Sequence, residues 1–356
     1  MTARFWFRIA APALFGVILL RAQYPGFQEG DYTISSFRFQ SGETLENVRL
    51  HYVTLGTPKR NDRGVVTNAV LIVHGTGGSS QQFLRAPHFH AELFGAGQPL
   101  DASRYFIVLP DCIGHGQSSK PSDGLRTRFP HYGYQDMVEL EKRLLEDGLG
   151  VTHLRLMMGT SMGCMHSWVW LTEHPGYADG AMPLACLPYP ITGRNLLWRQ
   201  MAMDLIRTDP AYQDGNYASQ PAAMKAVRDI QLLIGRNPQQ LQKQGSTRAD
   251  ALRLFAGLNG AAVTADANDS LYWLDASRDY DPSGRLDQIA VPVVAINFTD
   301  DPINPPELGI FRRETAKVRG IRAIEMQGTP DTFGHSSHTH AELWKRYLAD
   351  LLTSLE

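Results

Sequence analysis

The stretch "MMGTSMGCM", residues 157 to 165, decides the fold. Ser161 lies between Gly159 and Gly163 in the pattern G-x-S-x-G, after the apolar run "LRLMM" and before the helix-like run "CMHSWVWLTEH". A serine between a buried strand and a helix sits in a strained, tight turn, which requires small neighbours. The N-terminal N–H groups of the following helix favour negative charge at that turn. The pattern therefore predicts a nucleophilic serine, although a helix-capping serine in a glycine-rich turn is the plainer interpretation.

A nucleophilic serine needs a histidine base and a carboxylate that orients it, and in such a sheet the acid precedes the histidine along the chain. Asp300 and Asp301 follow the strand-like run "VPVVAINF", and "QGTPDTFGHSSHTH" follows "IRAIEM". We expect Asp301 to be the acid because it begins a D-x-I-x-P pattern, whereas Asp300 is suited to capping the turn. We expect His335, which follows a glycine, to be the base. His338 and His340 are expected in the first turn of the last helix, on the surface or packed against that helix.

The stretch "VHGTGGSS" predicts the place where a developing oxyanion is stabilised. It is a strand end followed by a glycine-rich turn, so the backbone N–H groups of Thr76 and Met162 are expected to converge on one point. A phosphate-binding loop is the alternative. It fits less well because the chain has neither a G-x-G-x-x-G pattern nor a G-K-[ST] after the glycines.

The apolar patterns around these motifs predict an α/β fold with a doubly wound, mostly parallel sheet. "YTISSFRFQ" and "VRLHYVTLG" alternate like an antiparallel edge hairpin, whereas "AVLIVHG" and "YFIVLPD" are continuous apolar runs, typical of strands buried on both faces. "YGYQDMVELEKRLLEDGLG" has the apolar spacing of a covering helix. The last helix, "HAELWKRYLADLLTSL", is expected to pack through a stripe of Leu343, Tyr347, Leu348 and Leu351.

Strand-like runs are missing between residues 187 and 285, where the sequence reads as a series of helices. We therefore predict a core formed by residues 23–186 and 286–356, with a helical lid inserted at 187–285. The first 22 residues are expected to lie outside this core. Arg4 and Arg8 precede a short apolar run, which is typical of an export signal cleaved near Ala22, or of an uncleaved N-terminal anchor.

The composition favours a protein that acts on a small molecule. A formal net charge of -2 without long basic runs gives no footprint for nucleic acid. Contact with a membrane is expected only through the N-terminal segment, and a homodimer is possible. The three cysteines, Cys112, Cys164 and Cys186, allow one disulfide, but their spacing does not identify the pair. We expect no cofactor and no metal, because the histidines at 88 to 90 and at 335 to 340 lack the partners of a zinc motif.

These motifs together resemble the α/β-hydrolase superfamily, and more narrowly its homoserine O-acetyltransferase-like branch. "FRFQSGETLENVRLHYVTLGTP" looks like the entry hairpin of that branch, "FPHYGYQDMVELEKRLLEDGLG" like its helix before the serine turn, "IRTDPAYQDGNY" like its lid signature and "FGHSSH" like its histidine loop. The resemblance covers nearly the whole chain after the N-terminal segment. It implies an α/β-hydrolase fold and an acyl-enzyme, with the nucleophile, acid, base and oxyanion donors at the positions given above: Ser161, Asp301, His335, Thr76 and Met162.

The chain departs from that branch at the expected substrate pocket. Met203 stands where the acetyltransferases carry an arginine that holds the amino-acid carboxylate, and Arg199, one helical turn earlier, either takes over this role or pairs at the surface. Arg199 and Tyr217 are our candidates for substrate binding. Other aromatic residues at similar spacings, Trp168, Trp198 and Phe83, either line an apolar pocket or belong to the core.

Three functions remain open at this point. The first is an exported, periplasmic or secreted serine hydrolase that cleaves an ester, lactone or related acyl compound through Ser161. The second is an O-acyltransferase of the homoserine O-acetyltransferase type, which an export signal disfavours because acetyl-CoA is a cytoplasmic donor. The third is a non-catalytic binding protein of the same fold, disfavoured because all the expected catalytic elements occur in order.

Overall fold

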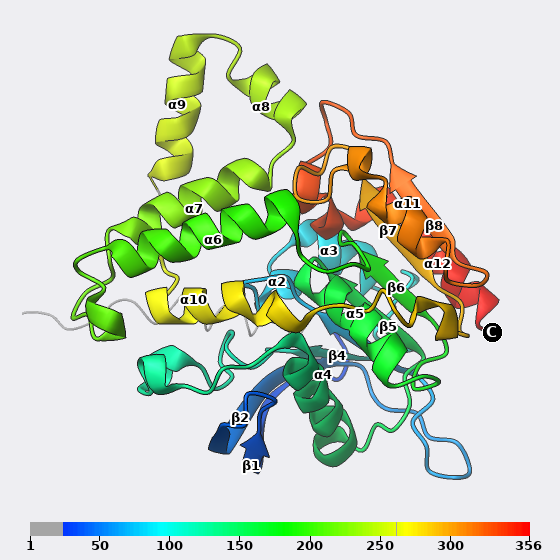
Figure 1. The fold of residues 1–356 in the computed structure, drawn as a ribbon. Coiled ribbons are helices and arrows are strands. Elements are labelled where there is room, and N and C mark those ends of the chain that lie inside the picture. Colours follow the sequence, from blue (N-terminus) through cyan, green and yellow to red (C-terminus); the bar gives the residue numbers. More distant parts are fainter. Residues whose placement is uncertain (1–23, 261) are drawn as a thin grey trace, which may run out of the picture.

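Eight strands form one sheet in the computed structural model, which describes residues 24–260 and 262–356 (Figure 1). The strands, in chain order, are β1 (Gln28–Arg38), β2 (Thr44–Leu55), β3 (Ala69–Val73), β4 (Phe106–Pro110), β5 (Leu156–Thr160), β6 (Ala181–Leu184), β7 (Val294–Phe298) and β8 (Arg322–Met326). Their spatial order is β1-β2-β4-β3-β5-β6-β7-β8. The predicted edge hairpin is confirmed, because β1 pairs antiparallel with β2 and β2 with β4, while every pair from β4 to β8 is parallel.

Helices cover both faces of this sheet. They are α2 (Gln81–Leu84), α3 (Pro87–Leu93), α4 (Tyr134–Arg143), α5 (Met162–Glu173), α6 (Gly193–Thr208), α7 (Ala223–Ile234), α8 (Pro238–Gln244), α9 (Arg248–Asn259), α10 (Ala267–Asp275), α11 (Ile310–Thr315) and α12 (Ala341–Ser354). Helix α4 continues into a π-helical turn, Leu144–Gly148. The predicted doubly wound α/β fold is therefore confirmed.

The strand residues alternate between two apolar cores. Leu71 and Val73 of β3 pack with α4 and α5, whereas Val70 and Ile72 pack on the opposite face with α3 and α12. All four side chains are fully buried. A strand that is buried on both faces needs apolar residues at every position, which is why these segments read as continuous apolar runs.

Helices α6 to α10 lie between β6 and β7, within the segment 187–285 predicted as a lid. Figure 1 shows α6, α7 and α10 beside the sheet, with α8 and α9 projecting away from it. Helices α6, α7 and α10 share a small apolar cluster of their own, which includes Trp198, Met203 and Trp273. This segment is therefore held mainly by its own core and by its contacts with the loops at the sheet edge.

The predicted export signal or anchor lies outside the described residues. In the part of the chain that is described, no helix has the length and apolar character required to cross a bilayer.

The C-terminal region differs from the expectation in one respect. His338 is not in the first turn of the last helix, because residues Gly334–Thr339 form a separate 3₁₀ helix and His340 occupies the N-cap position of α12. Helix α12 buries Ala341, Trp344, Leu348, Leu351 and Leu352. Leu343 and Tyr347 lie at the margin of the same core, partly buried.

Candidate active site

Ser161 occupies a sharp turn between β5 and α5. Its backbone has φ 54° and ψ −107°, a conformation that is unusual for a residue with a side chain. A side chain at Gly159 would place its Cβ 2.0 Å from the carbonyl oxygen of Gly163, and one at Gly163 would come 2.1 Å from that of Val73. The two glycines are therefore required for strand and helix to approach closely enough to form this turn.

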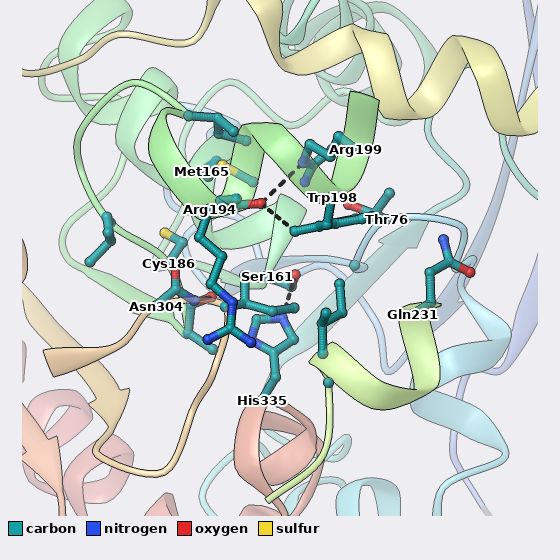
Figure 2. A pocket seen from close by; sticks show the side chains of 18 of the residues that line it. Thr76, Ser161, Met165, Cys186, Arg194, Trp198, Arg199, Gln231, Asn304 and His335 are labelled. Atoms are coloured by element: carbon teal, nitrogen blue, oxygen red, sulfur yellow. Dashed lines mark hydrogen bonds between the residues drawn. The ribbon is translucent and has the colours of Figure 1, made fainter. Parts of the chain in front are cut away.

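Three side chains from separate segments meet at this turn. Nε2 of His335 lies 2.8 Å from Oγ of Ser161, as the dashed line in Figure 2 marks, and Nδ1 of His335 lies 2.7 Å from Oδ2 of Asp301. Asp301 follows β7, and His335 belongs to the 3₁₀ helix after β8. All three stand at the carboxyl edge of the parallel strands, where α/β sheets bind their ligands.

Asp301 is held as a carboxylate. Burial raises the pKa of Asp301, but the nearby imidazole of His335 and the hydrogen bonds that the carboxylate accepts outweigh burial, so the pKa lies below its ordinary value. Asn304 contributes one of these bonds: its Nδ2 donates to Oδ2 of Asp301 over 2.9 Å and to the carbonyl oxygen of Ala185 over 3.1 Å. Sequence reasoning missed Asn304, which lies within the D-x-I-x-P pattern.

Asp300, the other candidate acid, is not the hydrogen-bond partner of the His335 imidazole. Its Oδ2 accepts hydrogen bonds from Oγ1 of Thr332 over 2.6 Å and from the backbone N–H of Gly334 over 3.0 Å. It therefore fixes the loop that carries His335, instead of capping only its own turn.

Of the residues expected to stabilise an oxyanion, Met162 directly follows Ser161, and Thr76 lies in the loop after β3, where Gly75 is close to Ser161. Across the described residues, no acceptor is seen for the backbone N–H of Thr76 or of Met162. Gln82 braces the loop of Thr76 against the serine turn: its Oε1 accepts from the N–H of Gly75 over 3.0 Å, and its Nε2 donates to Oγ1 of Thr160 over 3.0 Å. Two N–H groups are thus free for a ligand, and Gln82 is a further residue that the sequence did not reveal.

A cavity of about 570 Å³ opens in front of Ser161 and His335. Its wall combines the glycine-rich loop after β3 with the first residues of α6, the end of α7 and the loops after β6, β7 and β8. None of the described residues that line it is an Asp or a Glu, whereas Arg194 and Arg199 both contribute to it (Figure 2). The cavity is therefore suited to a small ligand that is neutral or anionic.

Arg199 is buried in this wall with neutral partners only. Its Nε donates to Oδ1 of Asn195 over 3.2 Å, its Nη1 donates to the carbonyl oxygen of Leu274 over 3.3 Å, and the guanidinium lies 4.9 Å from the ring centre of Trp198. Arg199 is 4% exposed, burial lowers its pKa, and the group that acts against burial is the Tyr134 hydroxyl and not a carboxylate. The expected alternative, a surface ion pair, is therefore wrong. Met203 is buried in the apolar cluster of the lid segment.

The aromatic candidates divide between cavity and core. Trp198 lines the cavity, together with Trp273, which the sequence reading did not single out. Trp168 and Phe83 are completely buried in the two sheet cores. Tyr217 is not among the residues that line the cavity, because its hydroxyl donates to Oδ2 of Asp266 over 2.6 Å within the lid segment. Its expected contact with substrate therefore does not fit the structure.

Cys164 and Cys186 form a disulfide, and Cys112 is a free, buried thiol. Cys164 is on α5, three residues after Ser161, and Cys186 lines the cavity. The bond therefore ties the helix of the serine turn to the cavity wall.

The histidines outside the Ser161 site pair with other groups. His338 packs edge-on against His335, with 5.1 Å between ring centres, and burial lowers the pKa of His338 to about 3. Within the described part of the chain, two groups of residues have the composition of metal ligands: His88 with His340 and Glu342, and Cys112 with Glu141 and His166. In both groups the carboxylate already accepts hydrogen bonds or ion pairs from its neighbours.

Comparison with known proteins agrees with this geometry. A probable acyltransferase of Methanothermobacter thermautotrophicus is 27% identical over 78% of this chain and 84% of its own length. A homoserine O-acetyltransferase of Pelobacter propionicus is 28% identical over 90% of this chain and 96% of its own. The crystal structure of an acetylester hydrolase from Corynebacterium glutamicum superimposes with a TM-score of 0.78, at 21% identity and over 92% and 96% of the two chains.

The expected resemblance to the homoserine O-acetyltransferase-like branch is thus confirmed by relatives that match most of the chain. The family model described as the alpha/beta hydrolase fold matches residues 68–315, which is more than half of the sequence. This chain belongs to the α/β-hydrolase fold family.

Proposed function

We propose that this protein is a serine hydrolase that cleaves a small ester or related acyl compound through an acyl-enzyme on Ser161. The observation that carries the proposal is the continuous hydrogen-bonded chain from Oγ of Ser161 through the His335 imidazole to the Asp301 carboxylate. A serine is a weak nucleophile by itself and reacts only when an adjacent base accepts its proton.

The reaction follows from this geometry in two halves. Nε2 of His335 takes the proton of Ser161 as Oγ attacks the carbonyl carbon, and Asp301 stabilises the imidazolium that forms. The N–H groups of Thr76 and Met162 stabilise the oxyanion, each by about 3 kcal/mol in the transition state. His335 then protonates the leaving alcohol, and the acyl group stays bound to Oγ of Ser161. In the second half His335 takes a proton from water as the water oxygen attacks the acyl carbonyl. It returns this proton to Oγ of Ser161 as the bond between Oγ and the acyl carbon breaks and the acid is released.

Hydrolysis is favoured over acyl transfer by two observations. The acetyltransferase arginine is replaced here by Met203, whose side chain is buried in the lid segment's own core. A disulfide joins Cys164 to Cys186, and disulfides persist in oxidising compartments, where acyl-CoA donors are absent. Both observations fit an exported enzyme with water as its acceptor, as the N-terminal sequence predicts.

The proposal is tested by reaction with a fluorophosphonate and by turnover of short p-nitrophenyl esters. The purified protein should react at a single serine and release p-nitrophenol. The Ser161→Ala variant should do neither. Ser167→Ala, which removes a buried hydroxyl two turns along α5, should still react. Absence of labelling in the folded wild-type protein would instead favour a non-catalytic binding protein.

Arg199 favours a second candidate, transfer of the acyl group to an alcohol that carries a carboxylate. A buried guanidinium whose partners are all neutral is electrostatically unsatisfied, and a bound carboxylate would pair with it. Acetyl-CoA should be incubated with the enzyme, with and without homoserine. Consumption of acetyl-CoA only in the presence of homoserine, with no ester hydrolysis, would establish transfer and overturn the first proposal.

A further inference from the structure

We infer that Asn237, a residue of the lid segment, positions His335 for the reaction proposed above; the inference rests on that proposed function. Asn237 lies about 100 residues before His335 in the sequence, at the N-cap of α8. Its side chain is completely buried. From Gly235 to Gly260, among the residues whose burial is described, it is the one buried side chain, and it is polar.

The oxygen and the nitrogen of the Asn237 amide bind different parts of the chain. Its Oδ1 caps α8 by accepting from the N–H groups of Gln239 over 2.8 Å and Gln240 over 3.3 Å. Its Nδ2 donates in the opposite direction, into the loop that carries His335. There it reaches the carbonyl oxygens of Thr329 over 2.6 Å and Thr332 over 2.9 Å, and Oγ1 of Thr332 over 3.2 Å.

The backbone of the lid segment also rests on this loop. Gly334, which directly precedes His335, has φ +62°, and a Cβ at this position would lie 2.6 Å from the backbone nitrogen of Asn237. Only a glycine allows so close an approach. The position of the His335 backbone is therefore set in part by the chain around Asn237.

The same contact extends to the acid loop. Thr332, which accepts from Asn237, donates through Oγ1 to Oδ2 of Asp300 over 2.6 Å, and Oδ2 of Asp300 also accepts from the N–H of Gly334. Asp300 is adjacent to Asp301. Asn237, Thr332 and Asp300 thus join the lid segment, the histidine loop and the acid loop in one partly buried hydrogen-bond network.

This network accounts for how the imidazole keeps its two short contacts. The loop from Gln327 to Phe333 has no regular structure, so side-chain hydrogen bonds replace a helix or strand in holding it. Displacement of a reacting group by about 1 Å can lower a rate by about 100-fold. Asn237 is thus a positioning residue: it acts through the loop and does not touch the substrate.

The experiment compares Asn237→Asp with Thr247→Ala in the full-length protein. Aspartate keeps the oxygen that caps α8 but replaces the donating amide by an oxygen that faces two carbonyl oxygens. Helices α8 and α9 follow each other and form a helical hairpin. Thr247→Ala removes the N-cap residue of α9 in this hairpin, where Oγ1 of Thr247 accepts from the N–H of Asp250 and not from the loop of His335. Any loss caused merely by a weakened hairpin should appear in both variants.

We expect Asn237→Asp to lower kcat for a small p-nitrophenyl ester by about 10- to 100-fold, with KM changed by less than about threefold. The rate of Ser161 phosphonylation should fall in parallel. Thr247→Ala should leave both rates unchanged. Thr332→Val, which keeps the shape but removes the hydroxyl between Asn237 and Asp300, should lower kcat in the same sense and serves if Asn237→Asp does not fold.

Equal rates for folded Asn237→Asp and Thr247→Ala would overturn the inference, as would a loss confined to KM. If the wild-type protein itself is not labelled at Ser161, the proposed function fails first. The two failures are therefore distinguishable.

Discussion

The serine turn and the histidine loop meet in one site but are built in opposite ways. The turn at Ser161 is fixed mainly by its own five residues, because two glycines allow α5 to approach β5 and β3 closely, and Gln82 only braces it. The loop of His335 is fixed from elsewhere, by Asp300 about 34 residues earlier and by Asn237 of the lid segment. A locally built element can be recognised in the sequence and tolerates distant changes. A loop held by remote side chains can be recognised only in the structure and is sensitive to those residues.

The largest expected effect is the loss of activity when either Ser161 or His335 is removed, because here the locally built turn and the remotely held loop are equally necessary. Ser161→Ala and His335→Ala should each lower kcat for ester hydrolysis by about a million-fold, and the double variant should lose little more, because both residues act in one proton transfer. The measurement is the steady-state kcat of the three purified variants with a p-nitrophenyl ester, taken after any initial burst. Multiplicative losses in the double variant would mean that serine and histidine do not work as a unit.

Next in size is the contrast between the two neighbouring acids. Asp301→Asn should lower kcat by about 10⁴-fold, since the orienting carboxylate is lost. Asp300→Asn should lower it by only about tenfold, since its partners are Gly334 and Thr332 and not the imidazole. Comparing kcat of the two variants at one pH sharpens the distinction between acting on His335 directly and acting through its loop. A larger loss in Asp300→Asn would exchange the two roles.

Removing the disulfide tests whether the region around the serine turn is stabilised by more than the two glycines of that turn. Cys164 and Cys186 are separated by 22 residues, so replacing both by alanine should reduce the free energy of unfolding by about 3 kcal/mol. Denaturant titration of the wild type with and without dithiothreitol should reproduce this loss. The same reagent should leave the double variant unaffected, and an effect there would point to a different origin.

A smaller effect concerns two buried histidines. Burial lowers the pKa of His338, whose ring packs against that of His335, and of His115, whose ring centre lies 5.0 Å from that of His74, to about 3. Below the ordinary value of 6.5 the unfolded chain takes up a proton that the folded one does not, so stability falls as pH falls from about 6.5 towards 3.

For each histidine, the loss of unfolding free energy between pH 7 and pH 5 amounts to about 2 kcal/mol. His338→Gln and His115→Gln should therefore each flatten the pH dependence of the unfolding free energy by this amount. Denaturant titrations at the two pH values provide the measurement. An unchanged slope in both variants would show that the two imidazoles take up protons as readily in the folded protein as in the unfolded chain.

The sequence predicted most where structure is local. The apolar runs predicted the buried strands and a mostly parallel sheet, since each strand of such a sheet must be apolar on both faces. The pattern G-x-S-x-G placed Ser161, and the chain order placed Asp301 and His335 at the edge where the structure brings them together. Their catalytic roles remain predictions, as do the division into core and lid and the export of the protein.

What the sequence could not predict depends on contacts between distant residues. The hydroxyl of Tyr217 is bound by Asp266, 49 residues later, and nothing near Tyr217 signals this partner. The pairing of Cys164 with Cys186 needs the spatial neighbourhood of α5 and β6. The amide side chains of Gln82, Asn237 and Asn304 gave no signal, because an isolated Asn or Gln is common in any loop.

The backbone conformation of Ser161 also lowers the free energy of unfolding of the whole protein. With φ 54° and ψ −107°, the backbone of Ser161 carries about 1 kcal/mol or more of strain, which a glycine at this position would not have. Ser161→Gly should therefore melt at a higher temperature than the wild type while being inactive. Selection for thermal stability alone would favour glycine over serine at position 161, so we expect the serine to be kept only where its catalytic role is needed.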